Sequence, residues 1–266
     1  MNATVIASGF YGKLPHVGDF VSRRLPGAFV RRWDDWLQEA LTCSQSVLGE
    51  KWLDIYLTSP IWRFALSAGV CGDRAYAGIL MPSVDKVGRY FPLTLAAPLE
   101  EQTMIPGLFL EGAQWFDTME ALALSVLEDN FNFEDFDRKL RNLPAPHTPF
   151  LGSLRFEYDG VDEKNQRLFR VQIDEPTQIR DPFIDLGALL PGGLPKAFSL
   201  WCASGSERVK PSLSGYRGLP PPSAYAELLA GEGGQIDTRN VTASQPQTQP
   251  HPNPGFCPDS LCSHEE

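Results

Sequence analysis

A helical pattern with two tryptophans on one face is the feature that most restricts how this chain of 266 residues can fold. Pro26 and Gly27 open the pattern. The apolar side chains that recur at helical spacing on one face are Phe29, Val30, Trp33, Trp36, Leu37, Ala40 and Leu41. Charged and amide side chains occupy the other face. Two indole rings on the buried face commit this helix to a large hydrophobic partner surface.

Short strands can supply that surface. Residues 61–66 and 76–81 are rich in aromatic and branched side chains, and a turn at 69–72 separates them. A third strand is expected at 91–96, where Pro92 should lie at the strand start or at a sheet edge. Connections this short favour antiparallel neighbours.

Further elements complete an α+β fold. Helices are expected at 51–58, 108–127, 133–143, 183–190 and 219–229, and strands at 167–173 and 197–203. In the strand at 167–173 we expect Leu168, Val171 and Ile173 to face inward. Prolines 220–222 fit the first turn of the last helix better than a polyproline ligand. We therefore predict a single domain over residues 1–230, a mostly antiparallel sheet flanked by helices.

From Gly231 onward the composition changes to Gln, Pro, Thr, Asn and Ser, and all periodicity ends. We expect residues 231–266 to form a disordered tail. The tail contains His251, Cys257, Cys262 and His264. Four residues separate its two cysteines in a flexible segment, unlike the tight pairs of a zinc site, so we expect no bound metal.

Charge is concentrated in the middle of the chain. The formal net charge is −10, and residues 100–189 alone carry 18 acidic against 8 basic side chains. An acidic balance argues against a nucleic-acid-binding protein and against a polybasic membrane-surface protein. The acidic middle third is either a solvated face or a surface that attracts a basic protein partner.

We expect a cytoplasmic protein, because the sequence lacks several features of membrane and secreted proteins. No stretch approaches the ~20 apolar residues of a membrane helix, and the first residues lack the charged start of a secretory signal. The five cysteines are scattered rather than arranged as a disulfide framework. Cys43, Cys71 and Cys202 have apolar neighbours and are expected to be buried thiols.

Motifs that carry catalysis are missing from the sequence. Gly12 and Lys13 superficially suggest a phosphate loop, but Leu14 stands where a Walker loop has Ser or Thr. The sequence contains neither G-x-G-x-x-G nor G-x-S-x-G. His16 and His147 are the only histidines of the predicted domain. We expect no catalytic residues, no metal and no cofactor.

Two loops combine glycine or proline with small polar and charged side chains, which is more than packing alone requires. The first spans residues 12–20 and includes Lys13 and Asp19, and the second spans residues 81–92 and includes Ser83, Asp85 and Arg89. A structural interpretation makes Asp85 a loop clasp paired to Arg89, and Asp19 a cap or a partner of Arg23. An enzymatic interpretation makes Asp19 and Asp85 paired carboxylates, with Arg63 or Arg89 holding an anion. We favour the structural or interface interpretation.

The sequence carries four ordered motifs: GFYGKLP at 9–15 with GDF at 18–20, WDxWL at 33–37 after Phe29, YLTSPIWRF at 56–64 and MPSVDxVGRYFPL at 81–93. Together these motifs resemble the TagF family of type VI secretion-associated proteins. A weaker likeness lies at residues 199–201 and 218–220, and residues 100–190 depart most from the family. The motifs cover about the first 95 residues.

The resemblance implies a cytoplasmic, non-enzymatic regulator in a Gram-negative bacterium. Family members repress type VI secretion after translation by engaging a forkhead-associated scaffold protein. The family has no established catalytic residues, so none is assigned here. We expect Trp33, Trp36, Trp62 and Phe64 to build the core. The residues expected to contact the partner are Lys13, Asp19, Arg63, Ser83, Asp85 and Arg89.

Two alternative functions stay open at this point. One is a small-anion or nucleotide-binding enzyme that uses Asp19, Arg63, Asp85 and Arg89, and it requires a deep pocket into which the last three converge. The other is an adaptor whose tail, residues 231–266, makes the binding contacts.

Overall fold

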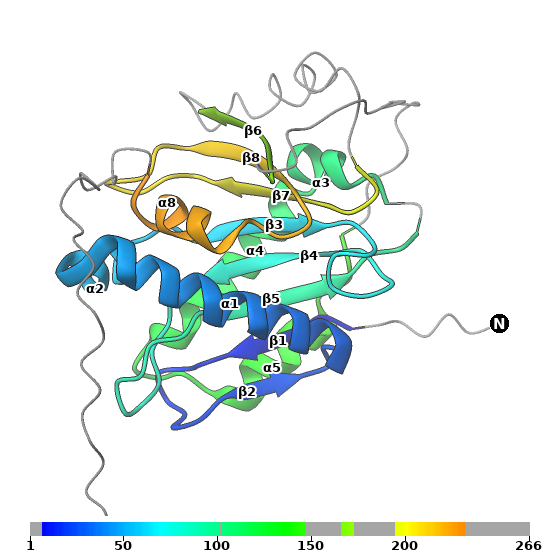
Figure 1. The fold of residues 1–266 in the computed structure, drawn as a ribbon. Coiled ribbons are helices and arrows are strands. Elements are labelled where there is room, and N and C mark those ends of the chain that lie inside the picture. Colours follow the sequence, from blue (N-terminus) through cyan, green and yellow to red (C-terminus); the bar gives the residue numbers. More distant parts are fainter. Residues whose placement is uncertain (1–6, 102, 147–165, 173–194, 232–266) are drawn as a thin grey trace, which may run out of the picture. The chain divides into compact units, whose positions relative to one another are not determined.

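The centre of the fold is an eight-stranded sheet in which every pair of neighbouring strands is antiparallel (Figure 1). The computed structural model describes residues 7–101, 103–146, 166–172 and 195–231. The strand order is β2-β1-β5-β4-β3-β7-β8-β6. The strands are β1 Gly9–Gly12, β2 Val21–Arg23, β3 Trp62–Leu66, β4 Tyr76–Met81, β5 Leu93–Pro98, β6 Arg167–Gln172, β7 Phe198–Ala203 and β8 Ser212–Arg217. The predicted α+β fold with a mostly antiparallel sheet is confirmed.

The first face of the sheet is covered by α1 (Gly27–Leu48), α2 (Trp52–Leu57) and α8 (Tyr225–Ala230) (Figure 1). The two-tryptophan helix therefore forms as expected and continues beyond Leu41 until Gly49, whose φ of 54° ends it. Trp33 is fully buried and stacks on Trp201 at an interplanar angle of 3°. The prediction that Trp33, Trp36, Trp62 and Phe64 build the core is confirmed, because all four belong to one buried cluster.

The second face is covered by α3 (Ile105–Glu111), α4 (Ala113–Leu124) and α5 (Phe133–Asn142). The prediction of one helix over 108–127 is wrong, because the chain breaks at Gly112 between α3 and α4. A Cβ atom at Gly112 would lie 2.5 Å from the carbonyl oxygen of Leu108, so the turn between the two helices requires glycine. The last turn, Ser125–Leu127, is a 3-10 helix.

Three strands were not expected from the sequence, and one expected strand is shifted. β1 and β2 lie in the first 27 residues, where glycine and proline are frequent. β8 carries Ser212, Ser214 and Gly215, which do not indicate a strand. The third expected strand starts two residues late, at Leu93, because Pro92 has no N–H for the ladder. In β6 Phe169 is buried, while Leu168, expected to face inward, is half-buried.

The end of the described chain confirms the expectation for the prolines only in part: Pro222 lies in the first turn, whereas Pro221, with a ψ of 145°, precedes it. Pro222–Ala224 form a 3-10 turn that leads into α8, with proline in its first positions. The described residues belong to one unit, Met1–Gln235, and a second unit, Ile236–Glu266, lies outside them. The predicted helix at 183–190 and, apart from Gly231, the predicted disordered tail lie outside the described residues as well.

Two of the three cysteines expected to be buried are buried. Burial raises the pKa of the Cys71 and Cys202 thiols to about 12, which keeps them protonated and unreactive. Cys43 differs from the prediction, since it is only half-buried on the flank of α1. None of the helices in the described ranges is long and apolar enough to cross a membrane.

Candidate functional site

The two unusual loops meet at one end of the sheet. The loop from Lys13 to Phe20 follows β1, and the loop from Pro82 to Pro92 joins β4 to β5. β1 pairs with β5, which brings the loops side by side. Two hydrogen bonds tie them together: Ser83 Oγ donates to the carbonyl of Lys13 at 2.8 Å, and Lys86 N donates to the carbonyl of Val17 at 3.1 Å. We call this pair of loops the double-loop site.

Asp85 is the centre of the double-loop site. Its Oδ1 accepts hydrogen bonds from the backbone N–H groups of Val87 (3.0 Å) and Arg89 (2.9 Å). Its Oδ2 accepts from Arg89 Nε at 2.7 Å and lies 3.0 Å from Lys13 Nζ. The hypothesis that Asp85 is a loop clasp paired to Arg89 is confirmed. The buried ammonium of Lys13 completes the clasp from the other loop, which sequence reasoning did not predict.

The pKa of Asp85 follows from this environment. Burial alone would raise the pKa of this carboxyl. The hydrogen bond from Arg89 N–H, the Lys13 and Arg89 cations and the Val87 N–H outweigh burial and hold its pKa well below the ordinary value of 3.8. Asp85 is therefore a permanently charged acceptor, with a pKa unsuited to a general acid or base near neutral pH.

A tight backbone turn fixes the tip of the second loop. Val84 and Tyr90 form an isolated antiparallel bridge, and Gly88 has a φ of 86°. The guanidinium of Arg89 also donates to the carbonyl of Gly18 at 2.5 Å, so one side chain holds the tip against the first loop. The tip is thus held in one conformation by contacts beneath it.

Tyr56 of α2 supports the loops from below, and sequence reasoning did not identify it. Its hydroxyl donates to the carbonyl of Ser83 (2.9 Å) and accepts from the Ser83 N–H (3.0 Å). The Tyr90 ring packs edge-on against Tyr56 and Trp52. The one signal that could have pointed to Tyr56 is its place in the motif at 56–64.

Burial separates the predicted contact residues into two groups. Lys13, Ser83 and Asp85 are buried and cannot touch a partner directly. Asp19 is exposed, accepts a hydrogen bond from the N–H of Phe20 and makes no contact with Arg23, which pairs with Asp137 instead.

The exposed surface of the double-loop site combines three apolar or aromatic side chains with charged ones, among them Asp19 and Lys86. Val87 is 67% exposed, Phe20 45% and Tyr90 37%, and the side chain of Arg89 lies among them at 56%. Phe20 is held by stacking on Tyr11 and by an edge contact with Phe91. Exposed apolar side chains on a rigid base are typical of a protein-binding surface.

Arg63 does not belong to this site. It lies in β3 with its side chain on the opposite face of the sheet, where Nε pairs with Glu120 (2.6 Å) and a terminal nitrogen with Asp117 (2.7 Å) of α4. The convergence of Arg63 with Asp85 and Arg89 that the anion-binding enzyme requires is therefore absent. The alternation of β3 could have indicated this, because Trp62 and Phe64 face α1 and Arg63 must face away.

Internal ion pairs neutralise much of the acidic middle third where it is described. Arg63 holds Asp117 and Glu120, and Asp137 is buried between Arg23 and Arg24. On the surface of α5, Asp135 pairs with Arg138 and Lys139. The described part of this region is thus a weaker attractor of basic partners than its composition suggests, and residues 147–165 and 173–189 lie outside the description.

The clasp predicts how stability depends on pH. Because the pKa of Asp85 is lower in the folded state than in the unfolded state, its contribution is present above about pH 4 and is lost as pH falls below it. Asp85→Asn is therefore expected to lower the melting temperature at pH 7 and to flatten its fall between pH 5 and 2. Thermal unfolding of both proteins across this range measures the difference. The pKa values of Asp135 and Asp137 are also lowered, but both residues are present in the wild-type protein and in the variant. Their contributions therefore cancel when the two melting curves are compared. Parallel curves would contradict the clasp.

Comparisons with known proteins match this chain in sequence and in fold. The model of a family described as "TagF N-terminal domain, Type VI secretion system-associated" matches residues 9–143, which include both loops. A crystal structure of PA0076 from Pseudomonas aeruginosa PAO1 superposes with a TM-score of 0.67 at 40% sequence identity. The match covers 87% of this chain and 97% of that one. No curated protein sequence gives a significant match.

Proposed function

The chain belongs to the TagF family of type VI secretion-associated proteins, and from this we propose that it represses type VI secretion after translation by binding a forkhead-associated scaffold protein. Family membership supports a regulatory role in type VI secretion. The scaffold partner, the repression and the location in the cytoplasm are parts of the proposal that rest on what the family resemblance implies. We propose a binding protein without catalysis of its own.

One observation carries the choice of surface: an exposed valine at the tip of a loop that buried ionic contacts hold rigid. Val87 lies two residues after Asp85, whose carboxylate accepts hydrogen bonds from the backbone N–H groups of Val87 and Arg89. A rigid apolar protrusion loses little conformational entropy when a partner covers it. A few side chains near the centre of an interface supply most of the binding energy, and Arg and Tyr, the residue types of Arg89 and Tyr90 beside Val87, are enriched among them.

The residues of the double-loop site then divide into two roles, and Phe20, Val87 and Tyr90 join the contact residues that were predicted from the sequence. Phe20, Val87, Arg89 and Tyr90 are the groups that would touch the scaffold, with Asp19 at the rim. Lys13, Ser83 and Asp85 act as positioning residues from beneath. Arg63 is assigned no contact, because its side chain is engaged by α4 on the far face.

Binding of the purified scaffold tests the proposal. Val87→Asp places a charge at the tip without touching the clasp side chains, and we expect it to weaken the Kd by about 30-fold or more. Val47→Asp is the matched control, since Val47 is 42% exposed on α1, and its Kd should stay within about twofold. Isothermal titration calorimetry measures both. Equal affinities for the two variants would remove the double-loop site as the binding surface.

A secretion assay in the native bacterium tests repression itself. Overproduced wild-type protein and the Val47→Asp variant are expected to suppress secretion, while Val87→Asp should not. Immunoblotting for equal protein levels excludes instability as the cause. If none of the three alters secretion while the scaffold binds, the surface stands and the repressor assignment fails.

A further inference from the structure

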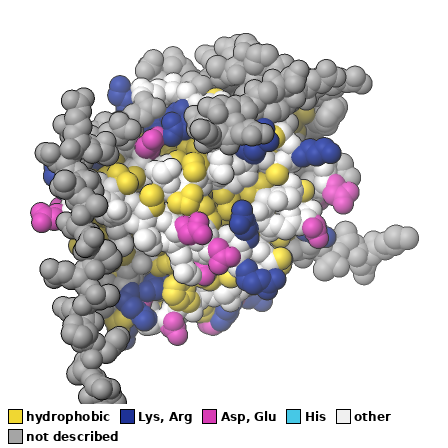
Figure 2. Space-filling view, in the orientation of Figure 1, with side chains coloured by type: hydrophobic (Ala, Val, Ile, Leu, Met, Phe, Trp, Pro, Cys, Tyr) yellow, Lys and Arg dark blue, Asp and Glu magenta, His cyan; other side chains and the backbone are white. Residues whose placement is uncertain are grey.

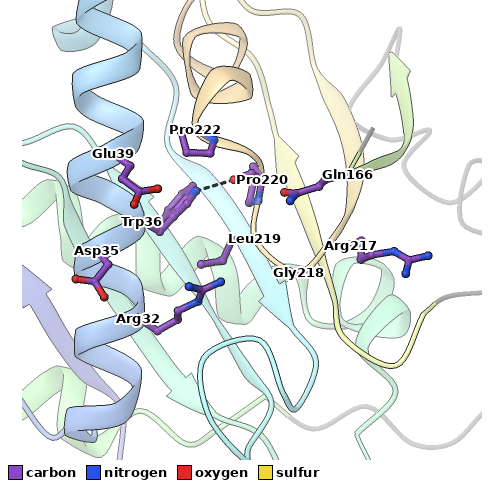
Figure 3. Close-up of a pocket in the computed structure, with 10 residues that line it drawn as sticks. All are labelled: Arg32, Asp35, Trp36, Glu39, Gln166, Arg217, Gly218, Leu219, Pro220 and Pro222. Carbon is purple, nitrogen blue, oxygen red and sulfur yellow. Dashed lines mark hydrogen bonds between the residues drawn. The ribbon is translucent and has the colours of Figure 1, made fainter. Parts of the chain in front are cut away.

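A groove on the flank of α1, beside the end of β8, is independent of the double-loop site. It runs between α1 and the corner Gly218–Pro222, and its deeper part has a volume of about 210 Å³ (Figure 3). A shallower depression continues it along α1 as far as Ser46, sharing Glu39 and Pro222 with the deeper part. From Arg32 to Ser46 the helix rises ~21 Å, so the groove is long.

The floor of the groove is rigid. The indole N–H of Trp36 donates to the carbonyl of Pro220 at 2.7 Å, which ties α1 to the corner (Figure 3). The same indole packs against Trp201 and Tyr225. A partner entering the groove would therefore meet a preformed surface.

Two carboxylates line this groove without ion pairs. Asp35 and Glu39 lie one turn apart on α1, on either side of Trp36 in the sequence, and among the described residues neither forms a salt bridge or side-chain hydrogen bond. Arg32 lies one turn before Asp35, with its guanidinium directed toward Leu219, while the Arg217 side chain points away from α1 (Figure 3). Acidic and basic side chains lie close together over this face, with apolar ones between them (Figure 2). The middle of the groove is thus acidic, and one end is basic.

The dimensions decide which class of ligand fits. Sites for nucleotides and cofactors usually have volumes of about 300–1,000 Å³ and are mostly apolar. The deep part of this groove is smaller and polar, which suits one long side chain. The continuation along α1 has a volume of about 630 Å³, but it is shallow and open to solvent, so it would not bury a compact ligand. An extended backbone that carries such a side chain can lie along it.

We infer that this groove docks an extended segment of a partner protein and holds an arginine or lysine side chain of that segment between Asp35 and Glu39. The two carboxylates supply charge complementarity, and Trp36 supplies a flat apolar floor for the aliphatic stem. Arg32 limits the site at one end and repels a cation there. The inference does not depend on the proposed function, because it involves a different surface.

Short peptides test the groove with the full chain. The probes are acetylated, amidated pentapeptides of alanine with a central arginine, citrulline or glutamate, titrated at low salt into isotope-labelled protein. We expect the arginine peptide to shift the Trp36 indole N–H signal and the backbone signals of residues 35–39, with a Kd in the millimolar range. Citrulline has nearly the same shape without the charge. The citrulline peptide should bind more weakly than the arginine peptide, by up to about fivefold.

Charge variants give the sign of the effect. Asp35→Asn combined with Glu39→Gln should weaken the arginine peptide about 3- to 10-fold, and Arg32→Gln should strengthen it. Asp54→Asn, an exposed acid on α2, is the matched control and should change nothing. The inference is overturned if the citrulline peptide binds as well as the arginine peptide, or if no peptide shifts these signals. It is also overturned if the glutamate peptide binds and Arg32→Gln abolishes that binding, because the occupant is then acidic.

Discussion

Trp33→Ala is expected to lower the free energy of unfolding by about 3–5 kcal/mol, a large share of the about 5–15 kcal/mol that holds a domain folded. Trp33 is fully buried at the contact between α1 and the sheet, where its ring meets Phe29, Trp36, Phe64 and Trp201. Alanine would leave a cavity that the surrounding aromatic rings cannot fill. Urea denaturation followed by circular dichroism measures the loss.

Two further variants separate packing from hydrogen bonding at this position. Trp33→Phe keeps an aromatic ring but removes the N–H that donates to Thr94 Oγ1 at 2.8 Å, and we expect a loss of about 1–3 kcal/mol. Val47→Ala, on the exposed side of the same helix, should cost no more than about 0.5 kcal/mol. A cost for Trp33→Ala as small as that of Val47→Ala would contradict the described core.

Gly12→Ala is expected to destabilise the protein by about 3 kcal/mol or more, and to disturb the double-loop site first. Gly12 ends β1 with a φ of 134°, a conformation that residues with a side chain rarely adopt. A Cβ atom there would lie 2.1 Å from the carbonyl oxygen of Pro92, at the start of β5. The strands β1 and β5 would have to separate where both loops begin.

Gly18→Ala is the control for this variant. Gly18 lies in the same loop, a Cβ atom there would meet nothing within 4 Å, and its φ needs no glycine. We expect a change within about 0.5 kcal/mol. Denaturant titrations of both variants, combined with the scaffold affinity of the soluble fraction, make the comparison. Similar losses for Gly12→Ala and Gly18→Ala would mean that the close approach of β1 and β5 is misplaced.

Strong periodic patterns predicted the fold, and weak ones did not. α1 follows the sequence closely because its apolar side chains repeat at helical spacing, and β4 because it is a short continuous run of apolar side chains. β8 was missed because it is buried along almost its whole length but carries serine and glycine in place of an apolar run or an alternating pattern. Gly215 illustrates the reason: a Cβ atom there would lie 2.3 Å from the Phe169 ring, a constraint set by a strand far away in sequence.

Local chemistry predicted only part of the double-loop site. Asp85 and Arg89 are only four positions apart in the sequence, and the turn residues between them predicted that the two would pair. The ion pair with Lys13 spans two loops far apart in the chain, so only the tertiary structure reveals it. Burial reversed the expected roles, because conspicuous polar residues such as Ser83 are inside, and Val87, which sequence reasoning did not single out, is exposed.

Hydrogen exchange of the full chain, alone and with the purified scaffold protein, tests the central claim most directly. The account predicts slower exchange on binding in residues 14–20 and 84–91, where the two loops surround Val87. Exchange in α4 and α5 on the other face should not change. Protection confined to α4 and α5, with the two loops unaffected in a saturated complex, would contradict the account.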